Sequence, residues 1–128
     1  MKLRRVLNPK RSADPAVAAN AIDMTISALA DPQRREVIEI LRDRPRAAGE
    51  LARLVGVSAP AMSRQLRTLR ESGLVSEAHA GFDARVRVYQ LVPGPMEDLK
   101  TWLEETERLW SRQLMSFKVH IEKTKRRK

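Results

Sequence analysis

The sequence predicts a mainly α-helical domain that carries one small β-hairpin. Apolar residues recur every three or four positions through most of the chain, which is the period of an amphipathic helix. Aspartate followed by proline, a common helix start, occurs twice in the first third of the chain. After Gly73 the pattern changes to alternation, which indicates strands. With 128 residues, 42% of them apolar, we expect one domain over residues 14–122 with a modest aliphatic core.

Two helices are predicted first, over residues 15–29 and 32–43. Ile22 and Ile26 lie on one face of the first helix, within an apolar surface that is broader than a single contact requires. We therefore expect this helix to contact both the core and a second subunit. The second helix ends before Pro45, because the residue that precedes a proline avoids the α conformation.

A short helix over residues 47–55 and a longer one over 58–72 are predicted to form a helix-turn-helix. Gly56 ends the first of them, since glycine adopts the left-handed conformation most easily. Ser58 caps the second, and Pro60 falls in its first turn, where a missing N–H costs nothing. Many structural helical hairpins share this pattern, so the outward-facing side chains must distinguish a DNA-binding pair from them.

The helix over residues 58–72 carries one narrow apolar stripe, formed by Met62, Leu66 and Leu69. Its opposite side is small, polar or basic, which suits insertion into the major groove of DNA. Arg64 is our first choice for a base contact, because a guanidinium donates two hydrogen bonds to guanine O6 and N7. The residues predicted to enter the groove are Ser58, Ala59, Pro60, Ser63, Arg64, Arg67 and Thr68.

A two-stranded hairpin is predicted over residues 74–91, with residues 79–84 as its connection. A hairpin directly after a recognition helix is a wing, so the whole pattern predicts a winged helix-turn-helix with five helices. Arg85 and Arg87 are expected to hold this wing against backbone phosphate. Such contacts fix the position of the protein along the DNA but do not distinguish one base sequence from another. The alternative is a solvated hairpin with ordinary surface arginines.

A long helix is predicted over residues 95–122, after two prolines break the chain. One side of this helix carries a nearly heptad repeat of mainly apolar residues, which we call its seam. The seam has spacings of 4, 3, 4, 4, 3 and 4 and consists of Leu99, Leu103, Thr106, Trp110, Leu114, Phe117 and Ile121. So long a helix cannot fold its whole apolar side onto so small a body. We therefore predict a homodimer whose interface is formed by the long N- and C-terminal helices. The expected interface residues are Ile22, Ile26, Leu99, Trp102, Leu103, Trp110, Leu114 and Phe117.

The net charge of +9 favours a polyanionic partner, but the charge is concentrated at the two ends of the chain. Residues 1–13 hold five lysines and arginines, and residues 118–128 hold six. The segment between these ends is nearly neutral, so net charge alone does not establish DNA binding. Residues 1–13 are expected to be a flexible basic arm, with phosphate binding as the alternative, and residues 123–128 a basic tail.

The composition argues against several classes of protein. There is no cysteine, which excludes disulfides, thiolate metal sites and cysteine nucleophiles. His79 and His120 stand alone, whereas metal sites need three or four convergent ligands, so we expect no metal, no cofactor and no enzymatic activity. No run approaches the ~20 apolar residues that cross a bilayer, and no signal peptide is evident. We expect a cytoplasmic protein with no membrane partner.

Three segments of the sequence resemble motifs of the ArsR family of winged-helix repressors, and they occur in the same order as in that family. They are LADPQRREVIEIL at 29–41, ELARLVGVSAPAMSRQLRTLRESGLV at 50–75 and VYQLVPGPMEDLKTWLEE at 88–105. The later WLEETERLWSRQLMSF, at 102–117, is similar to the metal-independent branch of this family, in which a long tryptophan-bearing helix follows the wing. The resemblance covers residues 15–121. It implies a homodimeric repressor that binds double-stranded DNA at an inverted-repeat operator, often the promoter of its own operon.

The chain also departs from the family pattern. Gln65 stands where histidine is often found in the recognition helix. Residues 47–52 read AAGELA where other members carry a cysteine-containing pair, and the last helix offers only His120 with Glu122. We therefore predict that metal does not control DNA binding. The alternatives are a metal- or small-ligand-responsive regulator of the same fold, and a weakly specific architectural or protein-interaction module.

Overall fold

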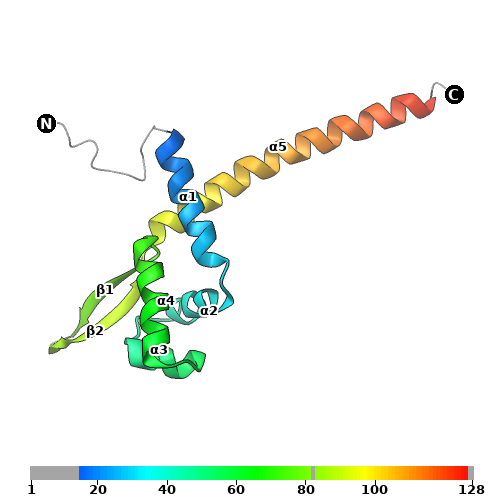
Figure 1. The fold of residues 1–128 in the computed structure, drawn as a ribbon. Helices are drawn as coiled ribbons and strands as arrows, with labels where there is room; N and C mark the ends of the chain where they lie inside the picture. Colours follow the sequence, from blue (N-terminus) through cyan, green and yellow to red (C-terminus); the bar gives the residue numbers. More distant parts are fainter. Residues whose placement is uncertain (1–14, 82, 127–128) are drawn as a thin grey trace, which may run out of the picture.

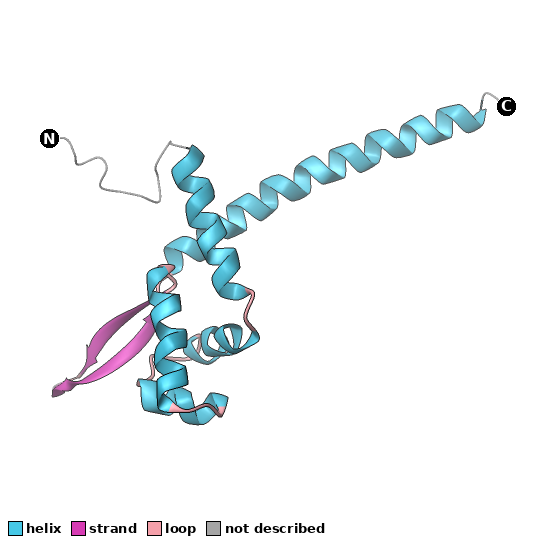
Figure 2. Ribbon diagram, viewed as in Figure 1, coloured by secondary structure: helices cyan, strands magenta, loops and turns pink. Residues whose placement is uncertain are grey.

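The computed structural model describes residues 15–81 and 83–126 and contains five helices and one hairpin (Figures 1 and 2). The predicted fold class, mainly helical with a β-hairpin wing, is confirmed. In chain order the elements are α1 (Pro15–Leu29), α2 (Pro32–Leu41), α3 (Ala48–Val55), α4 (Ala59–Glu71), β1 (Val75–Ala80), β2 (Asp83–Leu91) and α5 (Pro93–Arg126).

The core lies where α2, α3 and α4 meet the base of the hairpin. Its side chains are aliphatic apart from one methionine, as the low aromatic content predicts. The stripe predicted on α4 is buried: Met62 and Leu66 are 1% exposed and Leu69 is 0% exposed. The buried cluster consists of Ala28, Val37, Ile38, Leu41, Leu51, Ala52, Met62, Leu66, Leu69, Leu74 and Val75.

Helix α2 ends at Leu41, two residues before the predicted end. The reason is a tightening of its last turn, in which the N–H of Asp43 donates to the carbonyl of Ile40 at 3.3 Å. At the other end of α2, the Asp31 carboxylate caps the helix by accepting from the N–H of Gln33 at 2.7 Å.

The wing is an antiparallel pair in which Val75 faces Leu91 and His79 faces Arg87. Residues 79–84 were predicted as a loop, but pairing extends further, to Ala80 and Asp83, after a register shift. Gly81, at φ +52°, makes this short connection possible, since that backbone conformation costs glycine little.

A backbone bridge fastens the wing to the body. The N–H of Arg46 donates to the carbonyl of Tyr89 at 3.1 Å, and the N–H of Tyr89 donates to the carbonyl of Arg46 at 2.7 Å. The loop between α2 and α3 therefore lies against β2. Tyr89 and Leu91 pack on the core from this strand.

Helix α5 is 34 residues long and leaves the body after crossing α1 (Figure 1). It begins at Pro93 and runs through Arg126, so the predicted bounds of 95–122 are too narrow and most of the predicted tail at 123–128 is helical. Proline is tolerated in a first turn, and lysine and arginine both favour helix and complement the negative end of the helix dipole.

The predicted arm at 1–13, its neighbour Asp14 and the last two residues of the predicted tail lie outside the described residues. Within residues 15–81 and 83–126, no helix is both long and apolar enough to cross a membrane.

Candidate nucleic-acid interface

The outward face of α4 begins at a capped N-terminus. Ser58 Oγ accepts a hydrogen bond from the N–H of Ala61 at 3.2 Å, which is the cap predicted from the sequence. Thr68 is half-buried, and its hydroxyl donates to the carbonyl of Arg64 at 3.3 Å. The remaining predicted groove residues are exposed on this face: Ser58, Ala59, Pro60, Ser63, Arg64 and Arg67.

Arg64 and Arg67 are both exposed on the outer face of α4. Within the described part of the chain, neither forms an ion pair with a carboxylate. Other arginines do form such pairs, namely Arg34, Arg42, Arg44, Arg46, Arg70 and Arg87. The outer face of α4 therefore presents two cations that no acidic side chain of the described residues neutralises, which suits a polyanionic partner.

Gln65 is turned away from this face and toward α2. Its amide nitrogen donates to Gln33 Oε1 at 2.9 Å and to Asp31 Oδ2 at 3.2 Å. Its amide oxygen accepts from Arg34 Nη1 at 2.9 Å. Gln65 thus holds α4 against the start of α2.

Arg34 extends this cluster to α1. Its Nε donates to the carbonyl of Ala28 at 2.7 Å and its Nη2 to the carbonyl of Ser27 at 3.2 Å. One guanidinium therefore satisfies carbonyls at the C-terminus of α1 and contacts Gln65 on α4. The hydrogen bond from Gln65, followed by those from the start of α2, lowers the pKa of Asp31 below its usual 3.8.

Replacing Gln65 with alanine is expected to destabilise the domain by about 1 kcal/mol, because water can substitute for part of this half-buried cluster. Urea unfolding measures the loss. Gln90→Ala is the control, since Gln90 is exposed on β2 and its truncation is expected to change stability by less than ~0.5 kcal/mol. An unchanged stability together with an altered base preference would show that Gln65 contacts DNA instead.

Arg85 and Arg87 are both exposed on β2, and their spacing of two places them on one side of the hairpin. Arg87 Nη1 lies 3.9 Å from Glu77 Oε2, so this arginine has an acidic neighbour that the sequence analysis did not identify. The two residues stay candidates for phosphate contact at the tip side of the wing.

Glu77 joins the recognition helix to the wing. Its carboxylate accepts from the Tyr89 hydroxyl at 2.8 Å and lies 3.6 Å from Arg70 Nη1, on the last turn of α4. The hydrogen bond from Tyr89, with Arg70 and Arg87 nearby, lowers the pKa of Glu77 below its usual 4.5. Burial and the bond to Glu77 raise the pKa of the Tyr89 hydroxyl above 10.0.

The wing is expected to lose stability in acid. A glutamate whose pKa is lowered by folding contributes stability that is complete above its ordinary value of 4.5 and lost as the pH falls through the lower folded value. Thermal unfolding between neutral pH and pH about 3 measures this loss. Glu77→Gln keeps the shape of the side chain, and its melting temperature should vary less over this interval. An identical pH profile in the two proteins would show that Glu77 does not contribute.

Arg46 and Glu50 form a second cluster that the sequence analysis missed. Arg46 Nη1 donates to Glu50 Oε2 at 2.7 Å, and Arg44 Nη2 donates to the same oxygen at 3.1 Å. The pKa of Glu50 is lowered, first by the hydrogen bond from Arg46. The spacing of Arg46 and Glu50 at i, i+4 was the available signal. This pair fixes the start of α3 beside the bridge to Tyr89.

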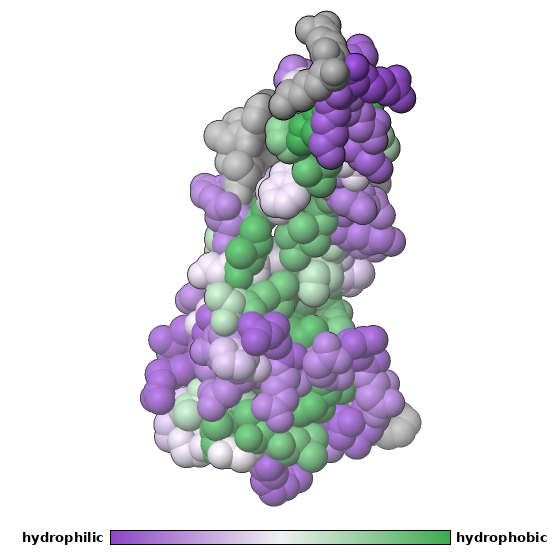
Figure 3. All heavy atoms as spheres, turned by 90° about the vertical axis from the view of Figure 1, so that its right-hand side faces the viewer, coloured by the Kyte–Doolittle hydropathy of each residue, from purple (hydrophilic) through white to green (hydrophobic). Residues whose placement is uncertain are grey.

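The predicted dimer face is largely uncovered in the single chain. Ile22 and Leu99 are half-buried, and apolar surface is exposed along this side of the molecule (Figure 3). The other predicted interface residues are exposed: Ile26, Trp102, Leu103, Trp110, Leu114 and Phe117. A surface of this kind indicates a site of interaction with another macromolecule.

His79 and His120, the two histidines of the chain, are exposed on different elements. Among residues 15–81 and 83–126, no three histidine, aspartate or glutamate side chains converge as a metal site would require.

Comparison with known proteins places this arrangement among bacterial regulators. The family model described as "Bacterial regulatory protein, arsR family" matches residues 31–77. The HTH-type transcriptional regulator Rv2034 of Mycobacterium tuberculosis is 41% identical over 95 residues, which cover 74% of this chain and 83% of the relative.

Two solved structures share the fold. The ArsR family transcriptional regulator RHA00566 is 31% identical, with a TM-score of 0.61 over 73% of this chain and 97% of that one. An ArsR-like transcriptional regulator from Rhodococcus sp. RHA1 is 25% identical, with a TM-score of 0.71 over 80% of this chain and 92% of that one.

Proposed function

This chain belongs to the ArsR family of DNA-binding transcriptional regulators, which are not enzymes, and on that premise we propose that it is a homodimeric repressor. It binds an inverted-repeat operator, controls its own promoter and does not require a metal ion.

The main observation that supports this proposal is the outer face of α4. A capped helix presents small side chains at its N-terminal end and two arginines without carboxylate partners among the described residues. Small residues let a helix approach the floor of the major groove, and Arg64 or Arg67 then reaches base edges or phosphate. Arg85 and Arg87 contact backbone phosphate from the wing. The residues of α4 that enter the groove are Ser58, Ala59, Pro60, Ser63, Arg64, Arg67 and Thr68.

The homodimer is supported by the exposed apolar side of α1 and α5. Several large side chains there are exposed in the described part of one chain, among them Trp110 at 67% exposure. A twofold axis between two copies relates their recognition helices, so the operator should hold two half-sites about 34–36 Å apart, one turn of DNA. The resemblance to repressors supports repression rather than activation.

Independence from metal is supported by the scarcity of side chains that could bind a metal ion. The 128-residue sequence holds no cysteine, and its two histidines lie on β1 and α5. The segment that carries a cysteine-containing pair in other members is AAGELA in this chain.

The experiment that tests the function is a titration of the purified protein against the DNA upstream of its own gene. Excess random duplex and a chelator are present throughout. Sharp, saturable binding at physiological salt is the expected result, with an affinity at least ~10³ times that for random DNA.

Other outcomes would contradict parts of the proposal. Binding that appears only after zinc is restored would overturn metal independence. Binding to every duplex alike, here and in a selection from genomic fragments, would indicate an architectural module. A selected site in another promoter would overturn autoregulation alone.

A further inference from the structure

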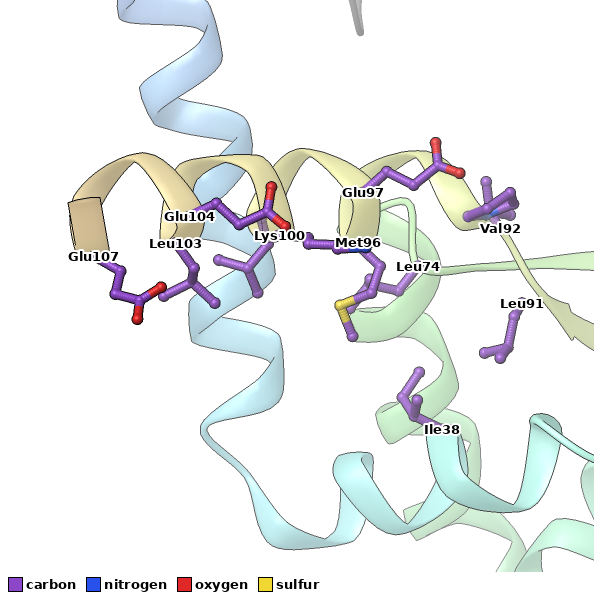
Figure 4. Close-up of a pocket in the computed structure, with 12 residues that line it drawn as sticks. Ile38, Leu74, Leu91, Val92, Met96, Glu97, Lys100, Leu103, Glu104 and Glu107 are labelled. Atoms are coloured by element: carbon purple, nitrogen blue, oxygen red, sulfur yellow. The ribbon is translucent and has the colours of Figure 1, made fainter.

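An apolar groove of about 850 Å³ lies beside the first half of α5 (Figure 4). Its inner wall comes from the body, where Ile38 lies on α2, Leu74 follows α4 and Leu91 ends β2. Met96 and Leu103 line it from α5, and both point to the side of this helix on which Ile38 lies. Pockets for small organic ligands typically have volumes of about 300–1,000 Å³ and are likewise lined mainly by apolar side chains.

A row of charged side chains borders the groove along α5. The row consists of Glu97, Lys100, Glu104 and Glu107, whose spacings of three, four and three place them on one side of the helix. All four are exposed, and three glutamates with one lysine give this rim a net charge of −2. Within residues 15–81 and 83–126, none of the three glutamates forms an ion pair. Their charges are therefore available to a ligand.

The charge of the rim is opposite in sign to the charge of the whole chain, which is +9. The overall charge attracts anions, whereas the rim attracts cations. The interior of the groove requires the rest of a ligand to be apolar, because a polar group buried there without a partner loses its hydrogen bonds to water. The groove thus fits an organic molecule with an apolar body and one positively charged end.

The groove also touches the segment that joins the recognition helix to the wing. The N–H of Leu74 donates to the carbonyl of Leu69, on the last turns of α4, at 3.0 Å. The carbonyl of Leu74 accepts from the N–H of Val92, directly before α5, at 2.9 Å. Leu74 and Val92 both line the groove. A molecule bound there would therefore contact α2, α5, the base of the wing and the residue that follows the recognition helix.

We propose that this groove binds an amphipathic organic cation, and that the bound cation changes the affinity of the protein for its operator. The apolar body of the ligand lies against Leu74, Met96 and Leu103, and its positive end lies at the acidic rim. Leu99 and Leu103 also belong to the predicted dimer face, and the groove extends from them toward α2, so the ligand lies beside the second copy. The binding site follows from the groove itself, whereas the effect on the operator rests on the proposed function.

Three probes with ten-carbon chains and different head groups test the class of ligand. Decylammonium, decan-1-ol and decanoate are each added to the full chain below the concentrations at which they form micelles. Equilibrium dialysis measures their affinities. Decylammonium should bind about tenfold more tightly than decanoate, with decan-1-ol between them, because the rim attracts one head group and repels the other. Equal or tighter binding of decanoate would overturn the choice of a cation. No binding of any probe would overturn the site, as expected if a second copy fills the groove.

Met96→Lys tests the location of the bound cation. Met96 is 39% exposed, so the variant should fold, but the new charge lies in the groove and replaces an apolar side chain. Decylammonium should bind to this variant about tenfold more weakly. Met115→Lys is the matched control, because Met115 is exposed on the same helix and does not line the groove. Equal affinities in the two variants would place the cation elsewhere and overturn the site.

Glu104→Gln combined with Glu107→Gln removes two charges from the rim and keeps the shape of both side chains. The affinity for decylammonium should fall about fivefold and that for decan-1-ol should not change, since only the cation interacts with the carboxylates. The control combines Glu105→Gln with Glu122→Gln, two exposed acidic residues of α5 outside the groove. An equal fall for decan-1-ol, or in the control protein, would overturn the role of the rim.

Repeating the operator titration with saturating decylammonium tests the effect on DNA binding. The operator affinity should change about fivefold or more, because couplings between two sites typically span roughly 5–150-fold. The affinity of Met96→Lys should not respond, and this separates the groove from any direct effect of the amine on DNA. An unchanged affinity of the parent protein would overturn the coupling. The titration without decylammonium judges the regulator itself, so failure of the proposed function and failure of this site are distinguishable.

Discussion

Replacing Leu69 with alanine is expected to destabilise the domain by about 2–5 kcal/mol, enough to unfold much of the protein at moderate temperature. Leu69 is 0% exposed, and it belongs to the stripe by which α4 packs on α2, α3 and the base of the wing. The truncation removes buried methyl groups and leaves a cavity that rigid neighbours fill only in part. Urea unfolding monitored by circular dichroism measures the change.

Leu54→Ala is the matched control for this prediction. It makes the same chemical change on α3, but Leu54 is 51% exposed. Its effect on the free energy of unfolding should be less than ~1 kcal/mol. If the two variants lose similar stability, the apolar stripe on α4 does not hold α4 against α3. The packing described here for these two helices would then be wrong.

Arg64→Ala is expected to reduce discrimination at one base pair of the operator by about 1–3 kcal/mol, which is roughly a fivefold to 150-fold change. The guanidinium is exposed near the N-terminal half of α4, where recognition helices contact base edges. Without an acidic partner among the described residues, its five donors are available to guanine. A library of operators with single substitutions, titrated at fixed salt, measures the discrimination.

Arg42→Ala removes the same charge from a site outside the proposed interface. Arg42 lies at the end of α2 and pairs with Glu39 at 2.6 Å. This variant should bind every operator in the library with its parental preferences. Arg64→Ala could instead weaken binding to all sequences equally and reduce the slope of the salt dependence by about one phosphate contact. That result would show that Arg64 contacts phosphate and not a base.

Local signals predicted the parts of this protein that depend on neighbouring residues. The cap at Ser58, the turn at Gly56 and the stripe on α4 follow from short-range propensity and helical period. The outward position of Arg64 follows from the same period. These features need no knowledge of what lies across the fold.

The missed features depend on residues that are distant in the sequence. Gln65 contacts Arg34 and Asp31, which are 31 and 34 positions earlier in the chain, and nothing local to Gln65 indicates them. The groove beside α5 likewise requires α2, the wing and α5 to be placed in space before it exists. The extent of α5 was underestimated because basic residues at a chain end resemble a tail as much as a final helical turn.

The bridge between Arg46 and Tyr89 has a further consequence for the behaviour of the protein in concentrated solution. A two-stranded hairpin has two open edges, and an open edge can recruit a strand from another molecule. Near the body, the loop between α2 and α3 occupies both backbone groups of Tyr89 on the outer edge of β2. Further out, Arg85 and Arg87 charge the same strand, and charge discourages edge-to-edge pairing. The strand that serves as a wing is thereby protected from aggregation along its length.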